Sequence, residues 1–225
     1  GLGDVYKRQA MACRFRKDGS RGLFLSEHRR CYDEIIDYCN KLVYQGKLKP
    51  CRGSIRHDDK NTLKSEFPAM GHFPIEVESS EKRGSSRFNK EEAQQIVQWI
   101  ATHADKIQST YPKEGGIENL IGVITPFKAQ AAVIKKALPK HLKKIRVGTI
   151  HTFQGAECRI IIISTVYGGE DGCFFIENNK SLMNVAVSRA KDFFFVFGNR
   201  KCLLHTESST TGLLRQMIEA SIAGK

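Results

Sequence analysis

Two polar segments, each beside an apolar run, carry residue types suited to binding phosphate groups. In the first, Asn184–Lys191, Arg189 lies at the edge of an apolar helical stripe formed by Met183, Ala186, Val187 and Ala190. An arginine there can pair with a surface carboxylate. It can also act as an arginine finger, whose planar and permanently charged guanidinium holds the γ-phosphate during transfer. Arginine fingers raise turnover by about 10³- to 10⁵-fold.

The second segment, Gly148–Glu157, places a polar turn between two predicted strands. Gln154 and Glu157 offer an amide and a carboxylate at close quarters, and Gly155 allows a close approach of the backbone to a ligand. Glu157 could accept a hydrogen bond from a ribose hydroxyl, as acidic residues do in other nucleotide-binding folds. The same carboxylate would also stabilise a helix N-terminus.

Other residues fit contacts to a nucleic-acid strand. Thr149 and His151, near the carboxyl end of a predicted strand, suit phosphate or sugar contacts. The Pro126–Phe127 turn begins a predicted helix, whose N-terminus can bind phosphate, and the ring of Phe127 could stack on a base. A structural histidine and a core phenylalanine fit His151 and Phe127 equally well.

Arg29 and Arg30 follow a strand-like run. Because adjacent side chains point in different directions on any regular element, at most one of these arginines faces a given ligand.

The composition predicts one globular domain with a polyanionic partner. The 225 residues are 40% hydrophobic, carry a net charge of +12 and have a pI near 9.4, which favours nucleic acid or simply solubility. The seven cysteines are scattered without a Cys-x-x-Cys pair, so we expect neither a metal site nor a disulfide framework, and a reducing cytoplasm or nucleus. No apolar run approaches the roughly 20 residues that span a bilayer, so no membrane partner is expected.

Strands alternate with amphipathic helices, which predicts an α/β fold with a mostly parallel sheet covered on both faces. We expect an irregular segment at 1–20, outside the native fold, and one domain at 21–225. Predicted strands cover residues 23–25, 72–77, 120–124, 145–150, 160–163 and 193–197. Predicted helices cover residues 32–44, 89–100, 125–138 and 213–222 and the segment that carries Arg189, with polar loops at 48–71 and 79–87. Asn89 and Glu92 have capping-box spacing, and Thr125 and Pro126 suit a helix start.

The order of the segments resembles the C-terminal motor domain of superfamily 1 helicases, in the branch related to the nonsense-mediated decay helicase and senataxin. The similarity runs from about Leu23 to Arg200. It is carried by five segments in the family's order: Phe24–Arg30, Asn40–Leu48, Ile121–Gln130, Gln154–Gly155 and Ser188–Arg189.

The resemblance implies a RecA-like fold, of the AAA or P-loop type, that closes over ATP and Mg²⁺ held mainly by a separate N-terminal RecA-like domain of the same protein. By motif position, Arg29 and Arg189 resemble the two γ-phosphate arginines. Gln154, Gly155 and Glu157 resemble the nucleotide-sensing segment, and Thr149, His151, Pro126 and Phe127 lie where family members touch single-stranded DNA or RNA.

The sequence departs from the helicase pattern in three ways. It has no Gly-x-x-x-x-Gly-Lys-[Ser/Thr] loop, no Asp-Glu pair after an apolar strand, and His28 where a tyrosine often precedes the first arginine. We therefore expect a fragment of a longer ATP-dependent helicase that is inactive as an ATPase alone. A stand-alone nucleic-acid-binding module and an ATP-sensing module remain the alternatives.

Overall fold

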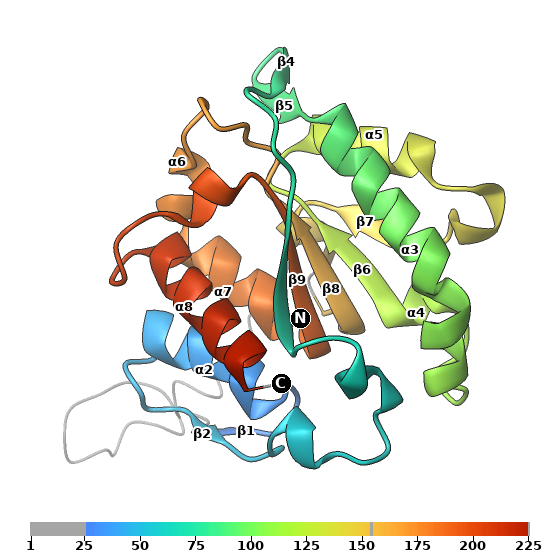
Figure 1. Cartoon of the computed structure of the whole chain (residues 1–225), viewed down its shortest axis with the longest axis vertical. Coiled ribbons are helices and arrows are strands. Elements are labelled where there is room, and N and C mark those ends of the chain that lie inside the picture. The colour runs from blue at the N-terminus through green and yellow to red at the C-terminus, as the bar shows by residue number, and fades with distance from the viewer. Residues whose placement is uncertain (1–25, 154, 225) are drawn as a thin grey trace, which may run out of the picture.

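The computed structural model describes residues 26–153 and 155–224, built around a five-stranded parallel sheet (Figure 1). The strand order is β3-β9-β8-β6-β7. The strands are β3 (Met70–Pro74), β6 (Ile121–Ile124), β7 (Arg146–Gly148), β8 (Cys158–Ser164) and β9 (Ala190–Gly198). All four neighbouring pairs run parallel, so the amino ends of the strands meet at one edge and the carboxyl ends at the other.

Apolar runs occupy the middle of the sheet. Ile160–Ile163 of β8 and Phe193–Phe197 of β9 are buried throughout. Strands buried on both faces read as continuous rather than alternating apolar runs. The predicted strand at 160–163 is confirmed as part of β8, which is third in the order of five.

Helices cover both faces of the sheet, which confirms the predicted fold class (Figure 1). The long helix α3 (Lys90–Thr110) packs with α5 (Lys128–Ala137) on one face, beside the short α4 (Ile117–Leu120). On the other face α2 (Asp33–Leu42) packs with α7 (Lys180–Ser188) and α8 (Thr210–Ala223), near α6 (Phe174–Glu177). On α3, Ala93, Ile96 and Ile100, which recur at helical spacing, are buried, and Val97 is partly buried.

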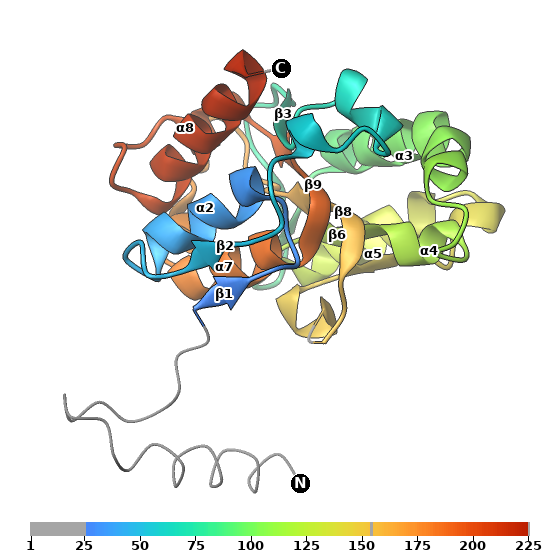
Figure 2. The ribbon, with the colours of Figure 1, turned by 90° about the horizontal axis from the view of Figure 1, so that it is seen from below.

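Shorter elements connect these layers. Two parallel strands, β1 (Glu27–His28) and β2 (Lys49–Pro50), form a separate ribbon at the amino-end edge of the sheet (Figure 2). The remaining elements are the antiparallel pair β4 (Glu81–Arg83) and β5 (Ser86–Phe88), and five 3₁₀ helices: η1 (Ile55–His57), η2 (Thr62–Ser65), η3 (Lys140–Leu142), η4 (Ile150–Phe153) and η5 (Arg200–Leu203). The predicted loop at 79–87 thus contains most of a short hairpin.

Four local predictions were wrong. Asn89 caps α3 by accepting from the Glu92 backbone N–H at 3.0 Å, but the Glu92 side chain bonds Ser164 and Val166, so the capping box does not close. Thr125 is not the N-cap of α5, because the helix begins at Lys128 and Phe127 is its N-cap residue. The Thr125 N–H donates to Gly148 O at 3.0 Å and extends the ladder with β7, and its Oγ1 accepts from the Phe127 N–H at 3.4 Å.

The third and fourth errors each concern the end of a predicted element. Ala190 belongs to β9 rather than to the helical stripe, since α7 ends at Ser188. The strand predicted for residues 145–150 ends at Gly148, because Ile150 begins η4. The predictions for residues 1–20 and 23–25 and for Gln154 lie outside the described residues. None of the helices in the described residues is long and apolar enough to cross a membrane.

Candidate functional site

An open cavity of about 630 Å³ lies where β8 and β9 begin, beside the β1–β2 ribbon. Its lining is strongly basic, with five cationic side chains against two carboxylates: Arg29, Arg30, Arg52, Arg159 and Lys191 against Glu27 and Glu157, with His28 completing the wall. Four chain segments supply these residues: β1 with the two residues after it, the second residue after β2, the start of β8, and the start of β9. A cavity with this excess of positive charge attracts a polyphosphate.

Arg29 and Arg30 diverge, as expected for neighbouring residues. The Arg29 side chain is 72% exposed, and among the described residues it pairs only with Glu27, which is on the same ribbon, at 2.8 Å. Arg30 instead turns to Glu157, with its Nε 2.8 Å from Oε1 of the carboxylate, and Lys191 Nζ lies 4.0 Å from Oε2. Both oxygens of Glu157 therefore face a cation.

The turn that precedes Glu157 requires a glycine. Gly155 has a φ of +77°, which L side chains rarely adopt, and no atom lies within 4 Å of where a Cβ would be. The requirement is therefore one of backbone conformation and not of space. The predicted turn is present, with Gly155 exposed two residues before Glu157.

Arg189 lies where α7 ends and β9 begins. Its carbonyl oxygen accepts from the Cys158 N–H at 3.1 Å, which places its backbone beside the segment that carries Glu157. The side chain is half-buried, and its Nε is buried without a hydrogen-bond partner among the described residues. Arg189 does not line the basic cavity itself. A buried donor without a partner is costly, which favours a ligand or a movement that satisfies it.

Asp192 anchors the floor of the cavity. Its carboxylate is 1% exposed and accepts from Arg52 Nη2 at 2.6 Å, Arg159 Nη1 at 3.3 Å and the Tyr111 hydroxyl at 2.7 Å. Arg52 also donates to the carbonyl oxygens of Arg30, at 2.8 Å, and Lys191, at 2.5 Å. One guanidinium thus ties the ribbon to β9.

These supporting residues were missed from the sequence. Arg159 and Asp192 had a usable signal, because each is a charged residue at the start of a long apolar run. Arg52 had none, since it lies in a polar loop.

His28 is held in place by the chain that follows it. Its Nε2 accepts from the Cys31 N–H at 3.2 Å. Burial, with the nearby Arg30 guanidinium, lowers the pKa of His28 below its usual range. The ring is therefore neutral and is held by the backbone that follows it.

The predicted nucleic-acid residues lie mainly at the opposite edge of the sheet. Thr149 and the Pro126–Phe127 turn follow β7 and β6, which are joined by the Thr125–Gly148 backbone bond. His151 is exposed on η4, two residues after Thr149. Since β8 is seven residues long, the two edges are about 20 Å apart.

Phe127 belongs to an aromatic cluster. Its ring centroid is 5.5 Å from that of Tyr167 in an edge-on contact and 5.9 Å from that of Phe175. Phe127 is half-buried, whereas Phe175 is 43% and the neighbouring Phe174 72% exposed. This aromatic surface at the carboxyl ends of the strands could support stacking even though the ring of Phe127 is engaged on one side.

A buried carboxylate lies under the same edge. Glu92 is fully buried and accepts from the Ser164 hydroxyl at 2.5 Å and from the Val166 N–H at 3.0 Å. Burial raises the pKa of Glu92 to about 8. Val166 has a φ of +76°, which is strained for a β-branched residue, and its bond to Glu92 helps to hold it there.

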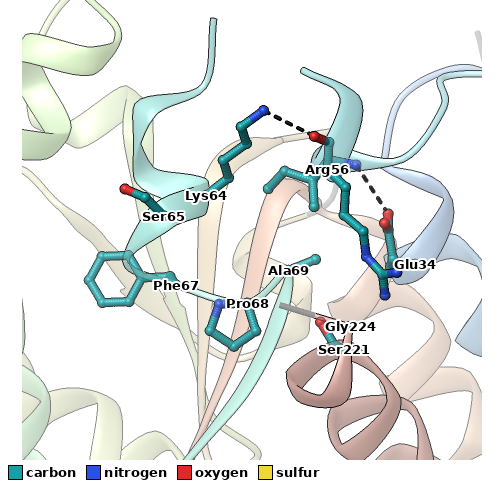
Figure 3. Close-up of a pocket in the computed structure, with 10 residues that line it drawn as sticks. Glu34, Arg56, Lys64, Ser65, Phe67, Pro68, Ala69, Ser221 and Gly224 are labelled. Carbon is teal, nitrogen blue, oxygen red and sulfur yellow. Dashed lines mark hydrogen bonds between the residues drawn. The ribbon is translucent and has the colours of Figure 1, made fainter. Parts of the chain in front are cut away.

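A separate cavity of about 340 Å³ lies between η1, η2 and the end of α8 (Figure 3). It contains none of the predicted site residues. Two of its three charged side chains are already engaged: Lys64 Nζ donates to Arg56 O at 3.0 Å, and Glu34 accepts from Ser54 and from the Ile55 N–H. We assign it no ligand. In the described part of the chain, no group of three or more His, Cys, Asp or Glu residues could hold a metal ion.

Comparison with known proteins identifies the family. Residues 7–201, most of the chain, match the family described as AAA domain. The chain belongs to this family. Together with the similarity to helicases described next, the match confirms the resemblance to the C-terminal RecA-like domain of superfamily 1 helicases.

Several helicases are similar to the chain. The human RNA helicase Mov10l1 is 31% identical over 193 residues, which cover 80% of the chain and 15% of that protein. The ATP-dependent helicase upf1 of Schizosaccharomyces pombe is 29% identical over 185 residues, which cover 77% of the chain and 19% of that protein. The Regulator of nonsense transcripts 1 homolog of Arabidopsis thaliana is 25% identical over 199 residues, which cover 82% of the chain and 15% of that protein. The chain thus spans less than a fifth of the length of each relative.

A solved structure, the C-terminal domain of a possible DNA helicase from Lactobacillus plantarum WCFS1, is 14% identical to this chain. The matched region covers 76% of this chain and 87% of the chain in that structure, with a TM-score of 0.42.

Proposed function

We propose that this domain is the arginine-supplying half of an ATP-dependent superfamily 1 helicase motor. ATP and Mg²⁺ are held mainly by an N-terminal RecA-like domain of the same protein, and this domain closes over them with its basic cavity. The observation that carries the proposal is the gathering of Arg29, Arg30, Arg52, Arg159 and Lys191 at the edge where β8 and β9 begin. Polyphosphate bound there would meet several cations at once.

In this proposal Arg29 and Arg189 touch the γ-phosphate. Arg29 is exposed and its one ion pair is local, so it can turn to a ligand at small cost. Arg189 already lacks a partner at Nε, so binding phosphate would satisfy a buried donor. Gln154, Gly155 and Glu157 form the sensing segment; the hold of Arg30 and Lys191 on Glu157 presents its carboxylate to the cavity, where a ribose hydroxyl can donate to it.

Thr149, His151, Pro126 and Phe127 contact single-stranded DNA or RNA at the other edge. The chain segment from Thr149 to Glu157 joins the two edges through η4. A change of nucleotide at one edge can therefore shift the strand contacts at the other, and alternating gaps between the two domains would move the strand. A reducing compartment, cytoplasm or nucleus, agrees with the six free cysteines of the described residues.

The test is ATP turnover by the complete protein. Arg29→Ala and Arg189→Ala should each lower kcat by about 10³-fold or more while strand binding stays close to that of the unsubstituted protein. Arg215→Ala is the matched control, because the Nε of Arg215 is also buried without a hydrogen-bond partner among the described residues, but Arg215 lies on α8, outside the basic cavity, and pairs with Glu219 of the same helix. Equal loss of turnover and strand binding would contradict the proposed roles and favour the alternative, a non-catalytic nucleic-acid-binding module.

A further inference from the structure

The segment from Asn119 to Ala156 is free of acidic residues. It carries seven Lys or Arg side chains and no Asp or Glu, in a chain whose net charge is +12. Six of the seven lie close together in sequence, at the end of α5, in the following loop and at the start of β7. We call these six residues the α5–β7 basic surface: Lys135, Lys136, Lys140, Lys143, Lys144 and Arg146.

The fold brings these residues together at one edge of the molecule. β7 is an edge strand of the sheet, and the loop from α5 to β7 projects beyond it (Figure 1). Lys143 Nζ donates to Lys135 O at 2.6 Å and to Lys136 O at 3.0 Å, which fastens the loop to the last turn of α5. All six residues are exposed, and none forms an ion pair with a carboxylate of the described residues.

Structural roles account for only part of this charge. Lys135 and Lys136 lie in the last turn of α5, where a positive charge stabilises the negative end of the helix dipole, and Lys143 binds the carbonyl oxygens of that turn. Arg146 lies on an edge strand, where a cation discourages pairing with the strand of another sheet. Lys140 and Lys144 lie outside both α5 and β7 and have neither role. With no carboxylate nearby in sequence, the repulsion among these cations is reduced when a polyanion covers them.

We propose that the α5–β7 basic surface binds the phosphate backbone of a nucleic-acid duplex that flanks the bound single strand. The chemistry of the surface favours a duplex over a strand. Residues 128–152 contain no Phe, Tyr or Trp, and proteins that bind single strands combine basic grooves with aromatic side chains on which bases stack. This surface offers only cations, which fits a backbone whose bases are turned inward.

The surface is placed to continue the path of the strand. Arg146 begins β7, and Thr149 follows the end of the same strand, so the two residues are about 10 Å apart along it. A nucleic acid that reaches Thr149 would thus extend over Arg146 towards Lys144 and Lys140. The path of the strand past Thr149 and His151 is the one point at which this inference rests on the proposed function.

The experiment measures binding of the 225-residue chain to a labelled single strand and to a blunt duplex by fluorescence anisotropy at several salt concentrations. The test variant is Lys140→Gln/Lys144→Gln/Arg146→Gln. The matched control, Lys47→Gln/Lys60→Gln/Lys113→Gln, removes the same charge from exposed positions elsewhere. A third variant, Thr149→Ala/His151→Ala, tests the strand contact. Thermal unfolding of each variant confirms that it folds.

We expect the test variant to lose duplex affinity at least tenfold more than the control does. If all three side chains contact phosphates, the slope of log K against log salt falls by about 2.7, which is 3 × ~0.9 for B-form DNA. The Thr149/His151 variant should lose single-strand binding and keep duplex binding.

Two results would overturn the inference: equal loss of duplex affinity in the test and control variants, or equal loss of single-strand and duplex affinity in the test variant. Unchanged single-strand binding in the Thr149/His151 variant would instead count against the proposed strand contact.

Discussion

Asp192→Asn should destabilise the domain more than any surface charge substitution. The carboxylate is 1% exposed and faces four donors, from Arg52, Arg159, Tyr111 and Asn61. An amide of the same shape keeps one accepting oxygen, carries no charge, and turns an NH₂ group towards these donors. Both guanidiniums, whose side chains are only 18% and 23% exposed, lose the charge that balances them.

Breaking one partner of a buried ion pair costs about 3–5 kcal/mol. At about 2–4 °C per kcal/mol for a domain of this size, the melting temperature should fall by roughly 6–20 °C. Urea unfolding can be followed by the fluorescence of Trp99, the single tryptophan, which is buried. Asp59→Asn is the matched control, since the Asp59 side chain is 99% exposed and pairs only with Lys64. A loss below about 1 kcal/mol for Asp192→Asn would refute the claim that this carboxylate anchors the cavity floor.

Three further predictions follow from single contacts. Because burial raises the pKa of Glu92 from 4.5 to about 8, the folded state holds a proton that the unfolded state releases. The contribution of Glu92 to the free energy of unfolding should therefore be greatest below pH 4.5 and fall between pH 4.5 and 8. Urea titrations should show that this part of the dependence of the unfolding free energy on pH is lost in Glu92→Gln. Gly155→Ala and Gly46→Ala, both at φ +77° with open space, should each cost about 1 kcal/mol in unfolding free energy, but only Gly155→Ala should also lower ATP turnover of the complete protein. Arg30→Ala, which frees one oxygen of Glu157, should raise the KM for ATP with little change in kcat; a fall in kcat alone would argue against a positioning role.

The fold was predictable because its signals are local. Ile160–Ile163 and Phe193–Phe197 are apolar runs too short for helices, and α3 shows a clear stripe at helical spacing. The errors arose where tertiary bonds compete with local preference. Thr125 has the side chain of an N-cap, yet its backbone is engaged by Gly148. Glu92 has the spacing of a capping box, yet its carboxylate is drawn to Val166 across the sheet edge.

The site was predictable only in outline. Motif order indicated Arg29, Glu157 and Arg189, and the fold brings their backbones to the same edge of the sheet. No sequence pattern could reveal that Arg30 pairs with Glu157, because the two residues are 127 positions apart and meet only through packing of the ribbon against β8. Arg52 likewise gains its role from two carbonyl oxygens supplied by other segments.

The central claim is that Arg189 contacts the γ-phosphate of ATP, and the most direct test compares two dissociation constants. For the complete protein, binding of a non-hydrolysable ATP analogue and of ADP would be measured with and without Arg189→Ala. A charge-assisted hydrogen bond contributes about 1.5–3 kcal/mol, so the analogue should bind about 10- to 150-fold more weakly while ADP binding is unchanged. Equal weakening of both nucleotides, or of neither, would contradict the account.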